Sequence, residues 1–342
     1  MNILLSAIEP SADRLGAELL AELARRGVRV RVRGLGGPLL QAQGLIPVAP
    51  LAPAAMGFIE VLRHLGALRR QRAALVAAAA AELPDLFLCI DAPDFHLPIA
   101  TLLRRRGIRT VGWVSPQLWA WRPGRKTTVA RAYDELLCLF PFEPQLYEGT
   151  TLNAVFVGHA AIDRGRPRQP EPGTVAIFPG SRPAEIMRLL TPFLAATRGY
   201  ARVLVAEAPG VDLGARLPPD ARLVVVPADE AIARCERALS KSGTVTLELA
   251  LAGVPSVVAH RVHPLTWLVG RLLVRGIRFL SLPNILLDRE VFREFVQHFM
   301  VAELSTALRI ARPPPTRELR ALVGPPGVVA RVADRITRGG RP

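Results

Sequence analysis

At 342 residues the chain is too long for one ordinary hydrophobic core and fits two domains of usual size. Half of the residues are apolar and 21% are charged, which excludes an intrinsically disordered protein. The formal net charge of +15 comes from arginines scattered along the chain, without a basic tail or a nucleic-acid-binding module. We therefore predict no nucleic-acid partner and favour an anionic membrane surface or a phosphorylated substrate.

The first predicted strand covers residues 2–8, an apolar run without the basic region of a signal peptide. Three polar side chains, Glu9, Ser11 and Asp13, follow the strand and precede a helix predicted at 13–26. They are candidates for shaping a loop or contacting a ligand at the end of the strand. Ser11 or Asp13 is equally consistent with a simple helix cap.

A second strand is predicted at 28–33 and a long helix at 57–82. The beginning of this helix interleaves large apolar residues with arginines, as an interfacial membrane helix does. An amphipathic helix packed on the core shows the same stripe, and both interpretations stay open. The candidate membrane contacts are Phe58, Ile59, Val61, Leu62 and Leu65.

The third strand is predicted at 85–90 and is followed directly by Asp91. A carboxylate at the carboxyl end of a buried strand is desolvated enough to act as a general base, which makes Asp91 the catalytic candidate. Asp94 is a second candidate for this loop, although it can equally cap the helix predicted at 97–106.

A strand at 108–114 leads into a loop that contains Trp119, Trp121 and Arg122. Two tryptophans in a loop favour a rigid amphipathic wall of a binding site, and a hydrophobic plug between structural layers is equally consistent with them. A strand at 135–140 and a helix at 144–148 complete the first half of the chain. Residues 158–173, rich in Pro, Arg and Gly, are the predicted linker.

After the linker the pattern restarts with a strand at 174–178, a turn through Ser181 and Arg182, and a helix that begins at Pro183. Backbone N–H groups, a hydroxyl and a guanidinium meet at this turn, which suits a phosphate or diphosphate. A plain turn with a solvated arginine is the alternative.

Four more strands are predicted at 202–206, 222–226, 238–240 and 256–259, with helices that begin near Thr244, His263 and Arg289. Ser242, Gly243 and Thr244 repeat the arrangement of the Arg182 turn, which strengthens the case for a nucleotide diphosphate. Neither turn is a Walker loop or a GxGxxG fingerprint, so ATP hydrolysis and nicotinamide chemistry are disfavoured.

Strands that alternate with helices predict an α/β protein with two successive Rossmann-like parallel-sheet domains and a cleft between them. We predict an N-terminal domain at 1–160, a second domain at 161–312 and a C-terminal segment at 313–342. That segment holds an amphipathic stretch at 316–338, which packs back on the first domain or on another subunit; the sequence leaves both open.

Three cysteines, Cys89, Cys138 and Cys235, lie far apart within apolar runs and are predicted to be buried free thiols in a reducing compartment. His260 and His263 lack further ligands at metal-binding spacing, so no metal site is predicted. His96 is interpreted as solvent-facing and His159 as a hinge or substrate contact in the linker. No uncharged stretch is long enough to span a bilayer, which predicts a cytoplasmic protein, soluble or bound peripherally to a membrane.

Taken in order, these motifs resemble the lipid A disaccharide synthase family, bacterial glycosyltransferases of the GT-B type. The resemblance covers nearly the whole chain. Its most specific strings are Ile90-Asp-Ala-Pro-Asp-Phe95 and Ser115-Pro-Gln-Leu-Trp-Ala-Trp121. It also includes Glu9-Pro-Ser-Ala-Asp13, Gly36-Gly-Pro38, Met56-Gly57, Phe140-Pro-Phe-Glu143, Phe156-Val-Gly-His159, Pro179-Gly-Ser-Arg182, Ser242-Gly-Thr244, Leu282-Pro-Asn284 and Arg289-Glu290.

The resemblance implies an inverting transfer of 2,3-diacylglucosamine from its UDP donor to 2,3-diacylglucosamine 1-phosphate (lipid X). The products are the β-1,6-linked lipid A disaccharide and UDP. It further implies no catalytic metal and no other cofactor, a peripheral location on the cytoplasmic face of the inner membrane, and in many members a homodimer formed through the C-terminal segment.

The resemblance also implies roles for individual residues. Asp91 is the candidate base, Trp119 and Trp121 shape the lipid-sugar side, and Arg122 lies near the acceptor phosphate. The implied nucleotide and diphosphate contacts are Ser181, Arg182, Ser242, Gly243, Thr244, Glu248, Asn284, Glu290 and Gln297.

This chain departs from the family pattern at Ala12, where the family has glycine, and at Arg293, where it has proline. Ala12 matters if its position requires a positive φ angle. Two other functions remain: another UDP-sugar GT-B enzyme, either a glycosyltransferase or an epimerase, or a non-catalytic relative that binds membranes or nucleotides. Turnover of UDP-N-acetylglucosamine would indicate the first, and binding without product the second.

Overall fold

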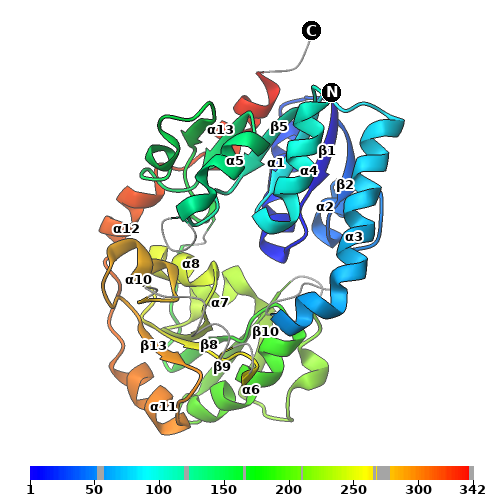
Figure 1. The fold of residues 1–342 in the computed structure, drawn as a ribbon. Helices are drawn as coiled ribbons and strands as arrows, with labels where there is room; N and C mark the ends of the chain where they lie inside the picture. Colours follow the sequence, from blue (N-terminus) through cyan, green and yellow to red (C-terminus); the bar gives the residue numbers. More distant parts are fainter. Residues whose placement is uncertain are drawn as a thin grey trace. The chain divides into compact units, whose positions relative to one another are not determined.

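The computed structural model of the protein describes residues 1–51, 58–118, 123–164, 167–208, 211–264, 267 and 278–338. The side chains of residues 58–64 and 123 lie outside this description. The chain divides into two compact units: Met1–Ala160 with Val323–Pro342 form the first unit, and Ala161–Leu322 form the second unit. Each unit is built on one parallel β-sheet (Figure 1).

The first unit contains a seven-stranded sheet in the order β3-β2-β1-β4-β5-β6-β7. Every recorded strand pair is parallel, and β1 lies between β2 and β4. The strands are β1 (Asn2–Ser6), β2 (Arg31–Leu35), β3 (Ile46–Pro47), β4 (Leu86–Ile90), β5 (Arg109–Trp113), β6 (Glu135–Cys138) and β7 (Asn153–Phe156). Strand order reverses between β1 and β4, and ligands of Rossmann-like domains bind beyond the carboxyl ends of the strands at such a reversal.

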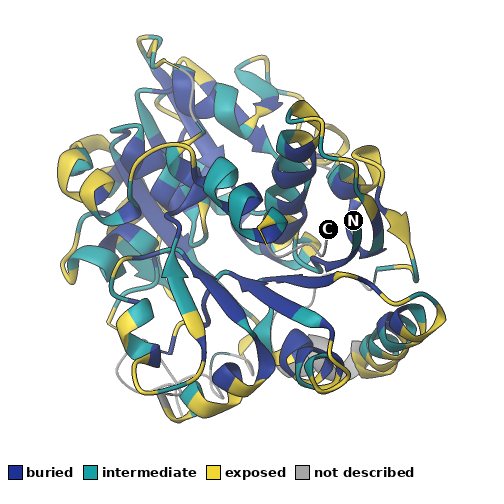
Figure 2. Ribbon diagram, turned by 90° about the horizontal axis from the view of Figure 1, so that it is seen from above, coloured by how far each residue is buried: buried dark blue, intermediate teal, exposed yellow. Residues whose placement is uncertain are grey.

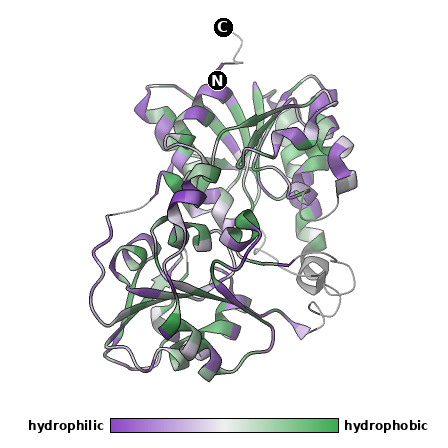
Figure 3. Cartoon of the chain, turned by 90° about the vertical axis from the view of Figure 1, so that its left-hand side faces the viewer, coloured by the Kyte–Doolittle hydropathy of each residue, from purple (hydrophilic) through white to green (hydrophobic). Residues whose placement is uncertain are grey.

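Helices cover both faces of this sheet because alternate strand residues are apolar on each side. Leu4 packs in a cluster with residues of α3, α4 and α5, whereas its neighbours Ile3 and Leu5 pack with α1, α2 and α13. The helices are α1 (Pro10–Arg25), α2 (Pro38–Ala42), α3 (Phe58–Ala81), α4 (Pro93–Arg105), α5 (Lys126–Ala132) and α13 (Val328–Thr337), with 3-10 turns at Pro123–Arg125 and Pro144–Tyr147. Figure 2 shows the strands as largely buried ribbon, and Figure 3 shows them as hydrophobic between helices of mixed hydropathy.

The second unit contains a six-stranded parallel sheet in the order β10-β9-β8-β11-β12-β13, with its strand-order reversal between β8 and β11. The strands are β8 (Thr174–Phe178), β9 (Arg202–Glu207), β10 (Leu223–Pro227), β11 (Arg237–Lys241), β12 (Ser256–His260) and β13 (Arg293–Val296). The helices are α6 (Pro183–Ala196), α7 (Ala228–Arg234), α8 (Val245–Leu251), α10 (Leu282–Leu287), α11 (Val301–Ile310) and α12 (Thr316–Val323), with 3-10 turns at Ala160–Ile162 and Gly214–Arg216. Residues of α6 and α11 pack on one face of the sheet in a single apolar cluster.

The fold class predicted from the sequence is confirmed: the protein is α/β, with two Rossmann-like parallel-sheet units. The prediction of a helix that begins near Arg289 is wrong. Asp288 ends α10 with a left-handed φ of 47°, and the chain then enters the edge strand β13. The turn after α10 is held by the buried amide of Asn284, which accepts from the N–H groups of Val291 and Phe292.

The C-terminal stretch expected as one amphipathic segment is two helices. Gly324 and Gly327 have φ angles of 82° and 86° and separate α12 from α13. A Cβ at Gly324 would lie 2.9 Å from the ring of Phe156, so glycine is needed for space as well as for its backbone angle. Helix α13 packs on α1 of the same chain (Figure 1), and Arg26 bonds Asp334 across that contact.

The structure also describes the cysteines and the linker histidine that the sequence singled out. The cysteines Cys89, Cys138 and Cys235 are buried and free, as predicted. The linker residue His159 is buried and stacks on Phe140 with ring centroids 5.8 Å apart. Within the described residues, no helix combines the length and apolar character needed to cross a bilayer, and no three His, Cys, Asp or Glu side chains are grouped to hold a metal ion.

Candidate active site

The loop after β4 has a strained backbone at the strand-order reversal of the first sheet. Asp91 and Ala92 have φ angles of 57° and 45°, and Val114, after the neighbouring β5, has a φ of 81°. Three non-glycine residues in the left-handed region each cost free energy, and such strain clusters at functional sites. The observed strain makes this edge of the sheet a candidate site, independently of the aspartate motif.

Asp91 is held by its backbone on two sides. Its N–H donates to the carbonyl oxygen of Trp113 at 2.9 Å, and its own carbonyl oxygen accepts from the ring of His96 at 2.7 Å. The carboxylate oxygen Oδ1 accepts from the N–H of Ala92 at 2.7 Å. A half-buried carboxylate on a fixed backbone at this position can accept a proton from a bound hydroxyl.

The interpretation of His96 as solvent-facing is wrong. The side chain is fully buried under the Asp91 loop, and burial lowers the pKa of His96 to about 4. The helix α4 begins at Pro93, earlier than the sequence predicts, and His96 therefore lies on its buried face. Asp94 does not cap this helix; it lies in the first turn and pairs with Arg125.

Among the residues after β1, Asp13 is a loop-shaping residue. Its buried carboxylate accepts from the N–H groups of Leu39 and Leu40, each at 3.1 Å, and so caps α2. A Cβ at Gly37 would lie 2.6 Å from this carboxylate, which explains the glycine there. Ala12 is a buried residue of α1 without a positive φ, so alanine brings no backbone strain. Glu9 precedes α1 without a side-chain cap bond, and Ser11 is half-buried in its first turn.

Trp119, Trp121 and Arg122 lie outside the described residues, and so do the side chains of Phe58, Ile59, Val61 and Leu62. The beginning of the tryptophan loop is described: Ser115 is buried and its hydroxyl bonds the hydroxyl of Tyr147 at 3.1 Å. Leu65 is 38% exposed on α3.

In the second unit, Arg182 and Lys241 meet at the strand-order reversal between β8 and β11. Both donate to Oε1 of Glu185 at 3.0 Å, and their side chains are only 15% and 12% exposed. Gly180 has a φ of 112°, and a Cβ there would lie 2.4 Å from Oε2 of Glu185. Two cations and one carboxylate leave this nearly buried group with a net positive charge.

The electrostatics of this group favour an anionic ligand. Burial alone would raise the pKa of Glu185, but the charges of Lys241 and Arg182 outweigh it and lower that pKa, so the carboxylate stays ionised. Burial and the Lys241 charge lower the pKa of His260, at the end of β12, to about 4, so this ring is neutral near pH 7. Glu185 Oε2 and His260 Nδ1 are buried without a hydrogen-bond partner among the described residues.

Sequence reasoning found Arg182 but missed Glu185, Lys241 and His260. The available signals were the spacing of Glu185, one helical turn after Arg182, and the position of Lys241, one of two lysines in the chain, directly before Ser242. Ser181 and Ser242 are half-buried beside this group, and Thr244 is exposed at the start of α8. The Ser242 hydroxyl donates to the Leu280 carbonyl at 2.8 Å.

Two of the predicted nucleotide contacts, Asn284 and Gln297, have protein hydrogen-bond partners in this structure. Asn284 is fully buried and its amide makes four protein hydrogen bonds, to Phe292 and Glu294 as donor and from Val291 and Phe292 as acceptor. No donor remains for a phosphate. Gln297 has a φ of 64° and its amide bonds both backbone polar groups of Val262, joining the ends of β12 and β13.

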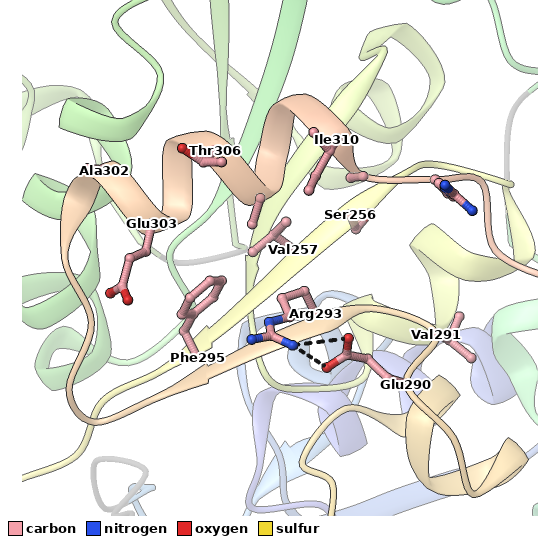
Figure 4. A pocket seen from close by; sticks show the side chains of 13 residues that line it. Ser256, Val257, Glu290, Val291, Arg293, Phe295, Ala302, Glu303, Thr306 and Ile310 are labelled. Atoms are coloured by element: carbon pink, nitrogen blue, oxygen red, sulfur yellow. Dashed lines mark hydrogen bonds and ion pairs between the residues drawn. The ribbon is translucent and has the colours of Figure 1, made fainter.

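The two acidic residues among the predicted nucleotide contacts, Glu248 and Glu290, each form an ion pair with an arginine. Glu248 pairs with Arg164 at 2.8 Å, with side chains 11% and 14% exposed. Glu290 is exposed and pairs with Arg293 at the start of β13. It lines a pocket of about 670 Å³ together with Ser256 and residues of α11 (Figure 4). Ser256 and Arg293 begin their parallel strands, so the pocket lies at the amino edge of the sheet, and Glu290 does not join Arg182 and Lys241 at the carboxyl edge.

Solved structures show the same fold. The calicheamicin glycosyltransferase CalG4 matches with a TM-score of 0.63 at 19% identity, covering 99% of this chain and 98% of that one. The Methanocaldococcus jannaschii UDP-GlcNAc 2-epimerase matches with a TM-score of 0.62 at 11% identity, covering 98% of this chain and 99% of that one. Two Rossmann-like units, each with a polar group at its strand-order reversal, give the chain the GT-B fold of these structures.

The family follows from sequence comparison. A family model described as lipid-A-disaccharide synthetase matches residues 3–201 and 216–309. The lipid-A-disaccharide synthase of Anaeromyxobacter dehalogenans is 39% identical, covering 98% of this chain and 96% of that protein. The one of Alkalilimnicola ehrlichii is also 39% identical, covering 87% and 85%. The chain belongs to the lipid-A-disaccharide synthetase family and is a glycosyltransferase of lipid A synthesis, as its sequence resemblance implied.

Proposed function

We propose that this enzyme transfers 2,3-diacylglucosamine from its UDP donor to 2,3-diacylglucosamine 1-phosphate, giving the β-1,6-linked disaccharide and UDP. Family membership over nearly the whole chain is the observation that carries this proposal. In a single displacement the acceptor hydroxyl oxygen bonds the anomeric carbon of the donor while the bond from that carbon to UDP breaks, which inverts the configuration.

In this proposal Asp91 is the general base. The acceptor hydroxyl loses its proton as its oxygen attacks, and the Asp91 carboxylate takes that proton. Three observations support the role: the position of Asp91 at the strand-order reversal, its half-buried side chain, and the left-handed backbone that holds it.

Arg182 and Lys241 are proposed to bind the diphosphate of the donor. Negative charge grows on UDP as the bond to the sugar breaks, and fixed cations with little exposure stabilise that charge strongly. Ser181, Ser242, Gly243 and Thr244 are the proposed neighbours of the diphosphate. Glu185 keeps the two cations at one point.

The direct test incubates the purified protein with both lipid substrates in detergent and follows the products by mass spectrometry. We expect the disaccharide and UDP in equal amounts. UDP-N-acetylglucosamine without the 3-acyl chain serves as the control donor. Turnover of that donor alone would indicate a different UDP-sugar enzyme, and UDP binding without any product would indicate a non-catalytic relative.

We also propose a peripheral location on the cytoplasmic face of the inner membrane, with the beginning of α3 as the contact. Exposed Leu65, Arg69 and Arg70 on this helix support it, because apolar and cationic side chains together favour an anionic interface. Sedimentation with phosphatidylglycerol vesicles, but not with phosphatidylcholine vesicles, is the expected result. If the protein sediments with neither vesicle type, or equally with both, the proposal is contradicted.

Lys241→Met should weaken UDP binding and raise the KM for the UDP donor, each by about tenfold, because a charge-assisted contact to phosphate contributes about 1.5–3 kcal/mol. Calorimetric titration with UDP measures the first effect. The control is Lys126→Met, which removes the only other lysine, a residue of the first unit that donates to the Glu148 carbonyl. An unchanged UDP affinity in folded Lys241→Met would remove Lys241 from the diphosphate site.

A further inference from the structure

His96 lies directly beneath the Asp91 loop and contacts it through one ring nitrogen. The side chain has no exposed surface; Nδ1 lies 2.7 Å from the Asp91 carbonyl oxygen and Nε2 lies 2.8 Å from the Ser6 hydroxyl. Ser6 ends β1 and Asp91 follows β4, so the ring joins the two strands that flank the strand-order reversal. An apolar side chain would fill this space equally well, which makes the two polar contacts the feature to explain.

The partners determine the tautomer of the ring. A carbonyl oxygen only accepts hydrogen bonds, so Nδ1 must carry a proton and donate it to Asp91. Nε2 of the neutral ring then accepts, and the Ser6 hydroxyl donates to it. Complete burial keeps the ring neutral, because desolvation disfavours the imidazolium form.

The hydrogen bond from His96 reaches a backbone segment with unfavourable φ angles. Asp91 and Ala92 are in the left-handed region, and side-chain-bearing residues persist there only where the surroundings hold them. The Asp91 N–H is bonded to β5 and its carbonyl oxygen to His96, so the peptide groups on both sides of its Cα are fixed. Rotation of the Ala92 amide away from His96 would redirect the Asp91 carboxylate.

We propose that His96 is a positioning residue that, with Ser6, locks the peptide after Asp91 and thereby aims the catalytic carboxylate. The proposal rests on the proposed function in that Asp91 is the base. His96 touches no reacting atom. Its effect is on the orientation of Asp91, and a misplacement of about 1 Å in a catalytic group costs up to about 100-fold in rate.

Two substitutions at position 96 distinguish an effect on the orientation of Asp91 from an effect on core packing. His96→Leu fills the space but has no donor, and we expect kcat to fall at least about tenfold while the KM for the UDP donor stays within about twofold. His96→Asn keeps an N–H donor near the position of Nδ1, and we expect it to restore most of kcat. Thermal unfolding shows that each variant is folded. Wild-type kcat in His96→Leu, or equal loss in both variants at equal stability, would overturn the proposal.

Ser6→Ala provides the test if His96→Leu does not fold. The variant removes only the hydroxyl that donates to Nε2, so we expect a several-fold loss of kcat with an unchanged donor KM. Wild-type kcat in folded Ser6→Ala would overturn the part assigned to Ser6.

Nitrogen NMR of histidine-labelled protein reads the tautomer without any activity. The expected signal is one neutral ring with a protonated Nδ1 and a bare Nε2, absent from His96→Asn. A protonated Nε2 at His96 would overturn the proposal. If the wild-type protein forms no disaccharide, the proposed function fails, and the NMR result alone then decides whether His96 holds the Asp91 peptide.

Discussion

Asp91→Asn should lower kcat by two or more orders of magnitude while UDP binding stays within about twofold of wild type. The amide keeps the size of the carboxylate and can still accept from the N–H of Ala92, but it cannot take a proton from the acceptor hydroxyl, and general-base catalysis contributes 10²–10⁴-fold. UDP is proposed to bind in the second unit, so its affinity should be unaffected. Turnover measured by mass spectrometry and UDP titration by calorimetry check the two parts.

The matched control is Asp85→Asn at the other end of the same strand. Asp85 precedes β4, and its carboxylate accepts from the N–H of Asn2 at 2.7 Å on the amino edge of the sheet. The change of charge and size is identical in the two variants. We expect near-wild-type turnover for Asp85→Asn. A comparable loss in both variants would show that Asp91→Asn acts through the stability of β4, and near-wild-type turnover of Asp91→Asn would remove Asp91 from the base role.

Glu185→Gln should lower the free energy of unfolding of the second unit by about 3 kcal/mol, because removing one partner of a buried ionic group leaves the others uncompensated. Here Arg182 and Lys241 lose the carboxylate they share. In calorimetry this corresponds to a fall in Tm of about 6–12 °C. Added UDP should stabilise the variant more than the wild type if its phosphates supply the missing negative charge to the same two cations.

The effect of Glu185→Gln should depend on pH. The pKa of Glu185 is lowered in the folded protein by Lys241 and Arg182, which outweigh the opposing effect of burial. A carboxyl group with a depressed folded-state pKa stabilises the fold above its unfolded pKa and loses this contribution as the pH falls. The stability difference between wild type and variant should therefore be fully present at neutral pH and shrink below about pH 4.5.

Glu171→Gln is the control for burial. Glu171 also joins two arginines, Arg202 at 2.8 Å and Arg234 at 2.6 Å, but its side chain is 35% exposed, against 9% for Glu185. Exposed ion pairs contribute little, and we expect a loss below about 1 kcal/mol. Equal losses at Glu171 and Glu185 would show that burial at the proposed diphosphate site has no special effect on the free energy of unfolding.

The sequence predicts the inner strands of both sheets well because those strands are continuous apolar runs that are buried on two faces. β4 and β8 are examples, with every residue buried. The edge strand β13 fails by the same criterion, since Arg293 is exposed and the other residues are half-buried. The apolar content of this segment fits a helix as well as a strand, and only its pairing with β12 distinguishes them.

Some residues of the candidate site can be predicted from the neighbouring sequence, and others cannot. Asp91 and Arg182 follow apolar strands in the sequence, so their places at the sheet edges can be predicted locally. Lys241 acquires its role by contact with Glu185 on a distant helix, and His96 by contact with Ser6 on β1. Asn284 shows the reverse case, because the amide of a polar residue in a family motif bonds the turn before β13 and Glu294 within β13. The contacts of Lys241 and His96 join segments that are distant in the sequence, and a single sequence does not display them.

Helix α13 makes the second unit an insertion within the first. The chain leaves the first unit after Ala160 and returns to it at Val323, and Val332, Ala333 and Ile336 of α13 are then completely buried in the cluster formed by α1 and the strands of the first sheet. During synthesis the first sheet must therefore wait, with one apolar face incompletely covered, until the whole second unit has been made. The second unit can finish folding earlier although it is encoded later, which reverses the usual N-terminal-first order of domain folding.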